Sequence, residues 1–278
     1  RASVRRERIE CREAREALRY FIVSYWHDIV RPSLVTLACE AVGGDSSAVA
    51  PIGRALTLFS GSTDVHDDMI DRTLAKKRRS TVLGRFGGDI ALWVGDVLIA
   101  KGYTELFEVL MGLDIPHERK LTIVRLIKDL YFEMGDGEVL ELKFRARPDV
   151  KPEEYLYVVR KKAADIDLCM RVGAILGGGT EEQVNSLGEY GRLLGTIVFL
   201  RDDFEDILDV DMGLNMRVKN ESFPLPLLYA LEDEEKKREI LTILKEEVKG
   251  KKAERLLKLV SEARGIERLW KLFEELKA

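Results

Sequence analysis

The chain has 278 residues, of which 46% are hydrophobic and 34% are charged, and it contains only seven prolines. This composition excludes a disordered chain and leaves room for long helices. Lys and Arg number 45 against 49 Asp and Glu, a net charge of −4. No general positive field therefore exists to hold nucleic acid, and we expect no nucleic-acid partner.

Hydropathy and the cysteines indicate the cellular compartment in which the protein is expected. No stretch of about 18 uncharged apolar residues occurs, so we expect no transmembrane segment. The first residues are charged where a secretory signal would be apolar, which predicts a cytoplasmic protein. Cys11, Cys39 and Cys169 lie far apart and form no CxxC motif, so we interpret them as reduced core thiols and not as zinc ligands.

Apolar residues recur at helical spacing along almost the whole chain, and alternating strand patterns are nearly absent. Thr180 and the acidic residues after it predict the start of a helix that runs into Asp202. Residues 232–278 combine Lys and Glu with Leu or Ile every three or four positions, which predicts amphipathic helices. We expect roughly eight to eleven helices in an all-α fold. No linker or repeat divides the chain, so residues 1–278 are expected to form a single domain.

A first acidic cluster lies in a helical segment. Asp67, Asp68 and Asp71 stand at i, i+1 and i+4, so Asp67 and Asp71 share one helix face and Asp68 flanks it. Carboxylates this close repel one another unless a cation lies among them, and hard oxygen ligands suit Mg²⁺. An acidic solvated turn would explain the same residues, but Val65 and Met69 make the immediate surroundings apolar.

A second cluster repeats this pattern. Asp202, Asp206 and Asp209 stand at i, i+4 and i+7, with Asp203 beside the first of them, in a strongly apolar helix. Burying several unpaired carboxylates there would cost kcal/mol each. We therefore expect them to line a cavity and to be compensated by a metal ion or another cation.

Two acidic helices can face each other in a helical bundle, where cofactor sites are built from inward side chains. We expect a bundle with a deep central pocket and two or three Mg²⁺ ions that arrive with a diphosphate substrate. Such ions would neutralise the charge of a departing diphosphate and leave an allylic carbocation in a dry pocket, without a nucleophilic serine or cysteine. The candidate metal ligands are Asp67, Asp68, Asp71, Asp202, Asp203 and Asp206.

With these motifs the sequence resembles the trans-isoprenyl (polyprenyl) diphosphate synthase family over about residues 31–231. The paired DDxxD motifs of that family match residues 67–71 and 202–206. Further family landmarks follow in the same order, at Gly95-Asp96, Gly137-Glu138 and Lys161-Lys162-Ala163. The resemblance implies a helical bundle of the isoprenoid synthase type, a Mg²⁺-dependent transferase and a homodimer.

The resemblance also assigns roles to individual residues. It implies catalytic roles for Asp67, Asp71, Asp202 and Lys161. The family's diphosphate-binding RRGxPT segment aligns with residues 76–81, where Lys76 and Lys77 keep the positive charge but lack the bidentate fork of arginine.

Other substrate contacts are expected at Arg31, Glu138, Lys162 and Phe199. Lys161 is the formal match to the family's lysine, and we expect one of the two neighbouring lysines to contact diphosphate. Phe199 could shield a carbocation or belong to the core. Ser62 and Thr63 are small where bulky aromatic residues would close the pocket floor in the family, which predicts room for a prenyl chain of C20 or more.

The sequence departs from the family where isopentenyl diphosphate would bind. The family pattern GGKRxRP aligns with residues 26–32, which read Trp-His-Asp-Ile-Val-Arg-Pro, so its lysine and first arginine are missing. Ser60 stands where the family has a histidine.

Three hypotheses for the function remain open. The first is a prenyltransferase that condenses an allylic prenyl diphosphate with isopentenyl diphosphate. The second is a terpene-synthase-like enzyme that ionises one long prenyl diphosphate, and the third is a non-catalytic diphosphate-binding or regulatory subunit.

Overall fold

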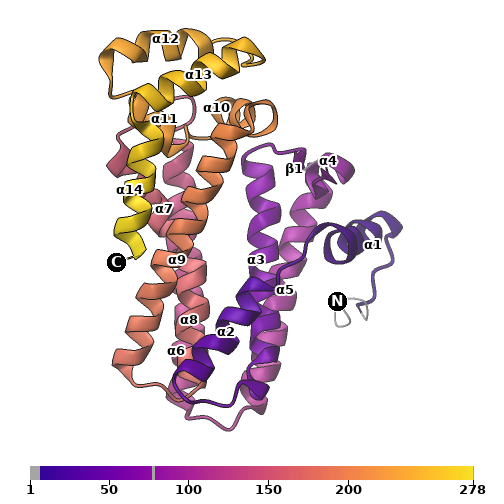
Figure 1. Ribbon diagram of the computed structural model, residues 1–278. Coiled ribbons are helices and arrows are strands. Elements are labelled where there is room, and N and C mark those ends of the chain that lie inside the picture. Colours follow the sequence, from indigo (N-terminus) through magenta and orange to yellow (C-terminus); the bar gives the residue numbers. More distant parts are fainter. Residues whose placement is uncertain (1–6, 77–78, 278) are drawn as a thin grey trace. The chain divides into compact units, whose positions relative to one another are not determined.

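The computed structural model describes residues 7–76 and 79–277, which are helical nearly throughout (Figure 1). The expected all-α fold is confirmed. Fourteen α-helices run along the described chain, more than the eight to eleven expected. The surplus comes from short helices such as α4 (Val82–Phe86), α10 (Asn215–Asn220) and α11 (Leu225–Ala230), which are too brief to show a helical period in the sequence.

The described residues form two compact units. The first unit holds the described residues up to Arg125 together with Leu168–Gly188, and the second holds Leu126–Asp167 and the described residues from Glu189 onward. Three helices contribute residues to both units, namely α6 (His117–Leu142), α8 (Ala164–Leu176) and α9 (Glu181–Leu208). The single domain expected from the sequence stays a prediction.

The first unit is built around two long helices that lie side by side, α3 (Ala50–Ile70) and α5 (Gly88–Gly112) (Figure 1). Pro51 falls in the first turn of α3, where its missing N–H removes no helical hydrogen bond. The remaining elements of this unit are α1 (Arg12–Arg19), the π-helical turn η2 (Tyr20–Tyr25), α2 (Val30–Ala41), the 3₁₀ turn η3 (Ser46–Ala48) and α4. Phe21, Val65, Val82, Val94 and Leu98 are buried together in its core.

A short hairpin follows α3. The two-residue strands β1 (Ala75–Lys76) and β2 (Arg79–Ser80) pair antiparallel, with Ala75 opposite Ser80 and Lys76 opposite Arg79. They are the only strands in the part of the chain that the structure describes. Nothing in the sequence indicated these strands, because a strand this short shows no alternation.

The second unit has its own apolar core. It holds α7 (Pro152–Lys162), the π-helical turn η4 (Val210–Leu214), α10, α11, α12 (Glu234–Leu244), α13 (Lys251–Glu262) and α14 (Gly265–Lys277). Every residue of α11 is buried, and it packs against α13 and α14 (Figure 1). The amphipathic helices expected over residues 232–278 are confirmed, because α13 buries Leu256 and Leu259 while α14 buries Leu269 and Phe273.

Two further expectations concern single features. Cys39 and Cys169 are buried as expected, but Cys11 is exposed because it precedes α1 and does not face the core. Among the described helices, none combines the length and the apolar character that a bilayer crossing requires.

We predict that the contact between α8 and α2 depends on a glycine. A Cβ at Gly173 would stand 2.3 Å from the carbonyl oxygen of Val35 and 2.8 Å from the Cβ of Ala38. Because backbone cannot move aside as a flexible side chain can, Gly173→Ala should lower the free energy of unfolding by about 1–3 kcal/mol in urea denaturation. Gly135→Ala is the control, since nothing lies within 4 Å of its added Cβ. It should be neutral or stabilising by up to about 1 kcal/mol, and equal losses in both variants would contradict this interpretation.

Candidate functional site: two acidic motifs and their internal cations

The first acidic motif lies at the carboxyl end of α3. Asp67 and Asp68 are in its last turn, and Asp71 follows its last residue. Arg72 then takes a left-handed conformation, with φ of 56°, which stops the helix. Asp68 is only 1% exposed, whereas Asp67 remains partly accessible. A buried carboxylate on an apolar helix face requires compensation, as the sequence predicted.

The compensation comes from Lys76 on the hairpin. Its Nζ lies 2.8 Å from Asp68 Oδ1, 3.3 Å from Asp64 Oδ1 and 3.6 Å from Asp67 Oδ2. The three carboxylates raise the pKa of Lys76 well above its usual value, although burial alone would lower it. The structure therefore brings Lys76 to the first motif. Lys77, its predicted companion, lies outside the described residues.

One lysine does not satisfy all the carboxylate oxygens. Asp67 Oδ1 and Asp68 Oδ2 are buried and find no hydrogen-bond donor among the described residues. Burial raises the pKa of Asp68 to about 7, even though Lys76 opposes this shift. Buried oxygens without donors are where an additional cation would be favourable, so the first motif fits a divalent ion that completes its shell with water and phosphate oxygens.

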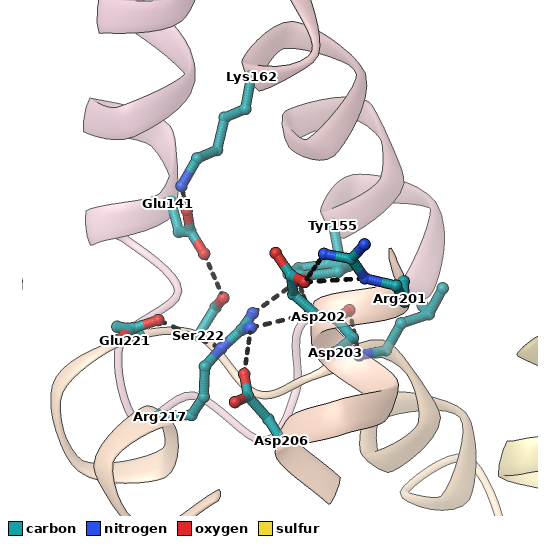
Figure 2. A network of polar contacts seen from close by, with 11 residues as sticks. Glu141, Tyr155, Lys162, Arg201, Asp202, Asp203, Asp206, Arg217, Glu221 and Ser222 are labelled. Carbon is teal, nitrogen blue, oxygen red and sulfur yellow. Dashed lines mark hydrogen bonds and ion pairs between the residues drawn. The ribbon is translucent and has the colours of Figure 1, made fainter. Parts of the chain in front are cut away.

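The second acidic motif lies near the carboxyl end of α9, and its aspartates have different surroundings (Figure 2). Asp202 is about half exposed and pairs with the neighbouring Arg201, whose Nη2 lies 2.7 Å from Asp202 Oδ1. Asp203 is 1% exposed. Asp206 is partly buried, and Gly213 lies against it, because a Cβ added there would stand 2.7 Å from Asp206 Oδ1.

Two residues that the sequence analysis missed hold this motif. Asp203 Oδ1 accepts a hydrogen bond of 2.7 Å from the hydroxyl of Tyr155 and lies 2.9 Å from Nη1 of Arg217. Asp203 Oδ2 accepts a 3.0 Å hydrogen bond from the backbone N–H of Leu225. The same Nη1 of Arg217 donates to Asp206 Oδ2 at 2.9 Å. Arg217 is thus the counter-charge of the second motif (Figure 2).

A second lysine joins the same network. Lys162 Nζ lies 2.7 Å from Glu141, which also accepts a 2.5 Å hydrogen bond from Ser222 (Figure 2). The same Nζ lies 3.0 Å from Glu138. Burial alone would raise the pKa of Glu141, but Lys162, Arg217 and the Ser222 hydroxyl outweigh it and lower the pKa to about 2. Glu141 is therefore ionised at any pH at which the protein would work.

The two neighbouring lysines separate in space. Lys161, the formal match to the family lysine, pairs with Asp136 at 2.9 Å and lies over the ring of Tyr157. Lys162 points instead into the carboxylate network and lies 5.7 Å from the ring centroid of Phe199. The structure thus connects Lys162 and Phe199, but not Lys161, with the network around the second motif.

The structure tests whether a metal ion fits, motif by motif. Among residues 7–76 and 79–277, no three carboxylates, imidazoles or thiols come together as a ready metal-binding group. The physical reason is that Lys76 and Arg217 stand between the acids. The first motif still offers two oxygens without donors, whereas Asp203 in the second offers none. The deep central pocket shared by both motifs stays a prediction.

The segment that would bind isopentenyl diphosphate in the family lines a cavity of about 330 Å³ inside the first unit. Asp28 accepts hydrogen bonds from the backbone N–H groups of Val30 and Arg31 and from the Arg31 guanidinium, and so caps α2. Ile29 is 79% exposed. The other residues that line the cavity are mostly apolar and include Phe21, Trp26, Leu58 and Leu98. Gly61 also lines it, directly before the predicted chain-length residues Ser62 and Thr63, of which Ser62 is fully buried.

The signals for the missed residues were weak. Tyr155 lies on the buried face of α7, and a buried tyrosine hydroxyl generally needs a partner, which the sequence alone could have indicated. Arg217 follows Asp206 by eleven positions in a stretch without clear periodicity. Its placement depends on how η4 and α10 fold, and no local pattern reveals that.

Comparison with known proteins gives consistent matches. A family model described as polyprenyl synthetase matches residues 16–262. The short chain isoprenyl diphosphate synthase of Methanothermobacter thermautotrophicus is 31% identical over 218 residues, 76% of this chain and 66% of that protein. The octaprenyl diphosphate synthase of Escherichia coli is 31% identical over 219 residues, 77% of this chain and 65% of that protein. The chain thus spans slightly less than two thirds of the length of these relatives.

A solved structure extends the match to the fold. The geranylgeranyl pyrophosphate synthetase from Pyrococcus horikoshii superposes with a TM-score of 0.79 and 25% sequence identity. The superposition covers 95% of this chain and 81% of that chain.

The environment of Asp68 predicts an unusual dependence of stability on pH. Its pKa is about 7 in the folded protein but near 4 when unfolded, so its contribution is most favourable at low pH and is lost as the pH rises through 7. Asp68→Asn cannot ionise. Its stability relative to the unsubstituted protein should therefore improve by roughly 1–3 kcal/mol between pH 5 and pH 8.

This is measured by urea denaturation in EDTA, which removes divalent ions. Asp89→Asn, an exposed acid on α5, is the control and should follow the unsubstituted protein at both pH values. A relative stability of Asp68→Asn that does not change with pH would show that Asp68 is not a protonated buried acid.

Proposed function

The chain belongs to the polyprenyl synthetase family, and we propose that it is a Mg²⁺-dependent prenyltransferase that condenses an allylic prenyl diphosphate with isopentenyl diphosphate. The observation that carries this proposal is the first acidic motif. It combines a partly exposed ammonium group with carboxylate oxygens that have no donor among the described residues, and this combination suits a diphosphate accompanied by divalent ions. We include a homodimer in the same proposal.

In this proposal the acidic residues would bind the metal ions and the lysines would bind diphosphate. Asp67, Asp68 and Asp71 would hold Mg²⁺, which supplies neutralisation of the charge that develops on the leaving diphosphate. Lys76 would bind a diphosphate oxygen through its Nζ, which already lies among the carboxylates. Lys162 would provide a second ammonium group, oriented by Glu138 and Glu141.

The reaction requires one bond to break and one to form. The allylic C–O bond breaks and its electron pair leaves with diphosphate. The double bond of isopentenyl diphosphate then attacks the cation, a C–C bond forms and one proton is lost. Phe199, half-buried beside Lys162, presents an aromatic face that could stabilise positive charge.

A second candidate function is favoured by a specific observation. In residues 26–32 the only Lys or Arg is Arg31, and its guanidinium is already paired with Asp28 at 3.1 Å. Ile29 carries no charge to hold a diphosphate. A terpene-synthase-like enzyme that ionises a single long prenyl diphosphate would not need this segment as a diphosphate site.

Product analysis separates the two functions. We expect purified protein with Mg²⁺ and geranylgeranyl diphosphate to form a longer prenyl diphosphate only when isopentenyl diphosphate is also present. Release of diphosphate with a hydrocarbon or alcohol from geranylgeranyl diphosphate alone would instead establish the second function. No turnover under either condition, with shorter allylic diphosphates tested as well, would favour a non-catalytic subunit.

Substitution of the accessible acids tests the metal roles. Asp67→Asn and Asp202→Asn each remove one carboxylate charge while keeping its shape, so turnover should fall by about 100-fold or more with little change in thermal unfolding. Both residues are partly exposed, so folding depends little on them. Asp89→Asn should keep full activity. If either variant remained as active as this control, the residue would not be part of the catalytic site.

A further inference from the structure

The second acidic motif contains a cation supplied by the chain itself. Arg217 lies on the short helix α10 with its side chain only 13% exposed. Its Nη1 is 2.9 Å from Asp203 Oδ1 and 2.9 Å from Asp206 Oδ2, and its Nε is 3.2 Å from Glu221 Oε2. Its Nη2 donates to the Tyr155 hydroxyl at 2.8 Å. Three carboxylates and one hydroxyl thus surround one guanidinium (Figure 2).

Both carboxylate oxygens of Asp203 already have hydrogen-bond or ion-pair partners. One accepts from Tyr155 and faces Arg217, and the other accepts from the backbone N–H of Leu225. A divalent ion at Asp203 would have to displace the guanidinium or break the hydrogen bond at the start of α11. The sequence predicted Asp203 as a metal ligand, but its contacts make it an anchor for Arg217, Tyr155 and Leu225.

The carboxylate oxygens of Asp206 are hardly more accessible to a metal ion than those of Asp203. Its Oδ2 accepts from Arg217, and its Oδ1 faces Gly213. The first motif differs, because Asp67 Oδ1 and Asp68 Oδ2 are buried and no residue that the structure describes donates to them. An entering cation would therefore gain more from the first motif than from the space between Asp203 and Asp206.

Arg217 is also held in place by its own helix. The Asn215 side-chain amide donates to the carbonyls of Val210 and Val248 at 2.9 and 3.0 Å, and its oxygen accepts from the N–H of Val248 at 3.0 Å. These bonds tie the first turn of α10 to η4 and to the loop before α13. The guanidinium is thus presented from a fixed backbone, in addition to its own four contacts.

We propose that Arg217 is the resident cation of the second acidic motif and occupies the position where a divalent ion would lie between Asp203 and Asp206. In the absence of diphosphate, this motif therefore binds no divalent ion, and resident ions are restricted to the first motif. Asp202 is half exposed and pairs only with the exposed Arg201 among the described contacts, so it remains accessible to an ion that a substrate brings. This inference depends on the proposed function in one respect, namely that divalent ions and a diphosphate bind at this motif.

The test measures Mn²⁺ binding by electron paramagnetic resonance, without any diphosphate. The starting protein carries Asp67→Asn and Asp71→Asn, which remove two carboxylate ligands from the first motif so that it no longer binds Mn²⁺. We expect it to bind no Mn²⁺ at the second motif. Adding Arg217→Met should create one Mn²⁺ site at the second motif, because a full positive charge is removed from among three carboxylates. Its affinity should exceed any residual Mn²⁺ binding by the starting protein by roughly 10-fold or more.

Two matched variants complete the design. Arg217→Lys keeps the charge and should bind no more Mn²⁺ than the starting protein. Arg255→Met removes an exposed arginine that pairs only with Glu239 among the contacts described, and it should change nothing. Unchanged Mn²⁺ binding in a folded Arg217→Met variant, verified by circular dichroism, would overturn the inference.

A second measurement covers the case in which Arg217→Met does not fold. Asp206→Asn, made alone in the otherwise unsubstituted chain, should leave the number of bound Mn²⁺ ions unchanged, since Asp206 is paired with Arg217. Loss of one bound ion would overturn the inference. Neither measurement depends on turnover, so a failure of the proposed enzymatic function would appear separately, in the product analysis.

Discussion

The need to compensate carboxylates buried on apolar helices is the constraint on which the rest of this structure depends. Asp68 and Asp203 are each 1% exposed, and an isolated charge at such a position would be prohibitively costly. Each motif meets this need with a basic residue from a segment that follows it in the chain, Lys76 after the first and Arg217 after the second. The local fold of both segments can be understood as the means of delivering that charge.

The chain after each motif is shaped accordingly. Arg72 ends α3 in a left-handed conformation, and the hairpin of β1 and β2 then returns Lys76 to the carboxylates. After the second motif, η4 and α10 bring Arg217 back, and Asp203 also binds the backbone at Leu225, where the wholly buried α11 begins. Asp203 therefore couples the polar network to the apolar core of the second unit.

Sequence reasoning succeeded where a local pattern carries the information. Helical periodicity identified the all-α fold, and the spacing of Asp67, Asp68 and Asp71 identified a site that requires positive charge. Lys76 was named through the family resemblance as a diphosphate-binding residue, and its pairing with the acids of the first motif became visible only in the structure. Arg217 and Tyr155 were missed because their partners lie 11 to 62 positions away, and only the tertiary fold brings them together. The sequence left open which of Lys161 and Lys162 acts, since adjacent helix positions point about 100° apart and only packing shows which one faces the acids.

The two motifs are consequently not equivalent, although their sequences are nearly repeats. Within the described part of the chain, the first keeps carboxylate oxygens without donors beside the ammonium group of Lys76, whereas the second is closed by a guanidinium and a tyrosine hydroxyl. The segment at residues 26–32 shows the opposite change, because Asp28 and Ile29 stand where the resemblance placed a lysine and an arginine. Positive charge is thus present at both acidic motifs and reduced at the segment expected to bind the second diphosphate. Lys76 lies among the carboxylates of the first motif, whereas Arg31, the only Lys or Arg in residues 26–32, is paired with Asp28. The two segments to which the resemblance assigns diphosphate binding, residues 76–81 and residues 26–32, therefore differ in the positive charge that they offer.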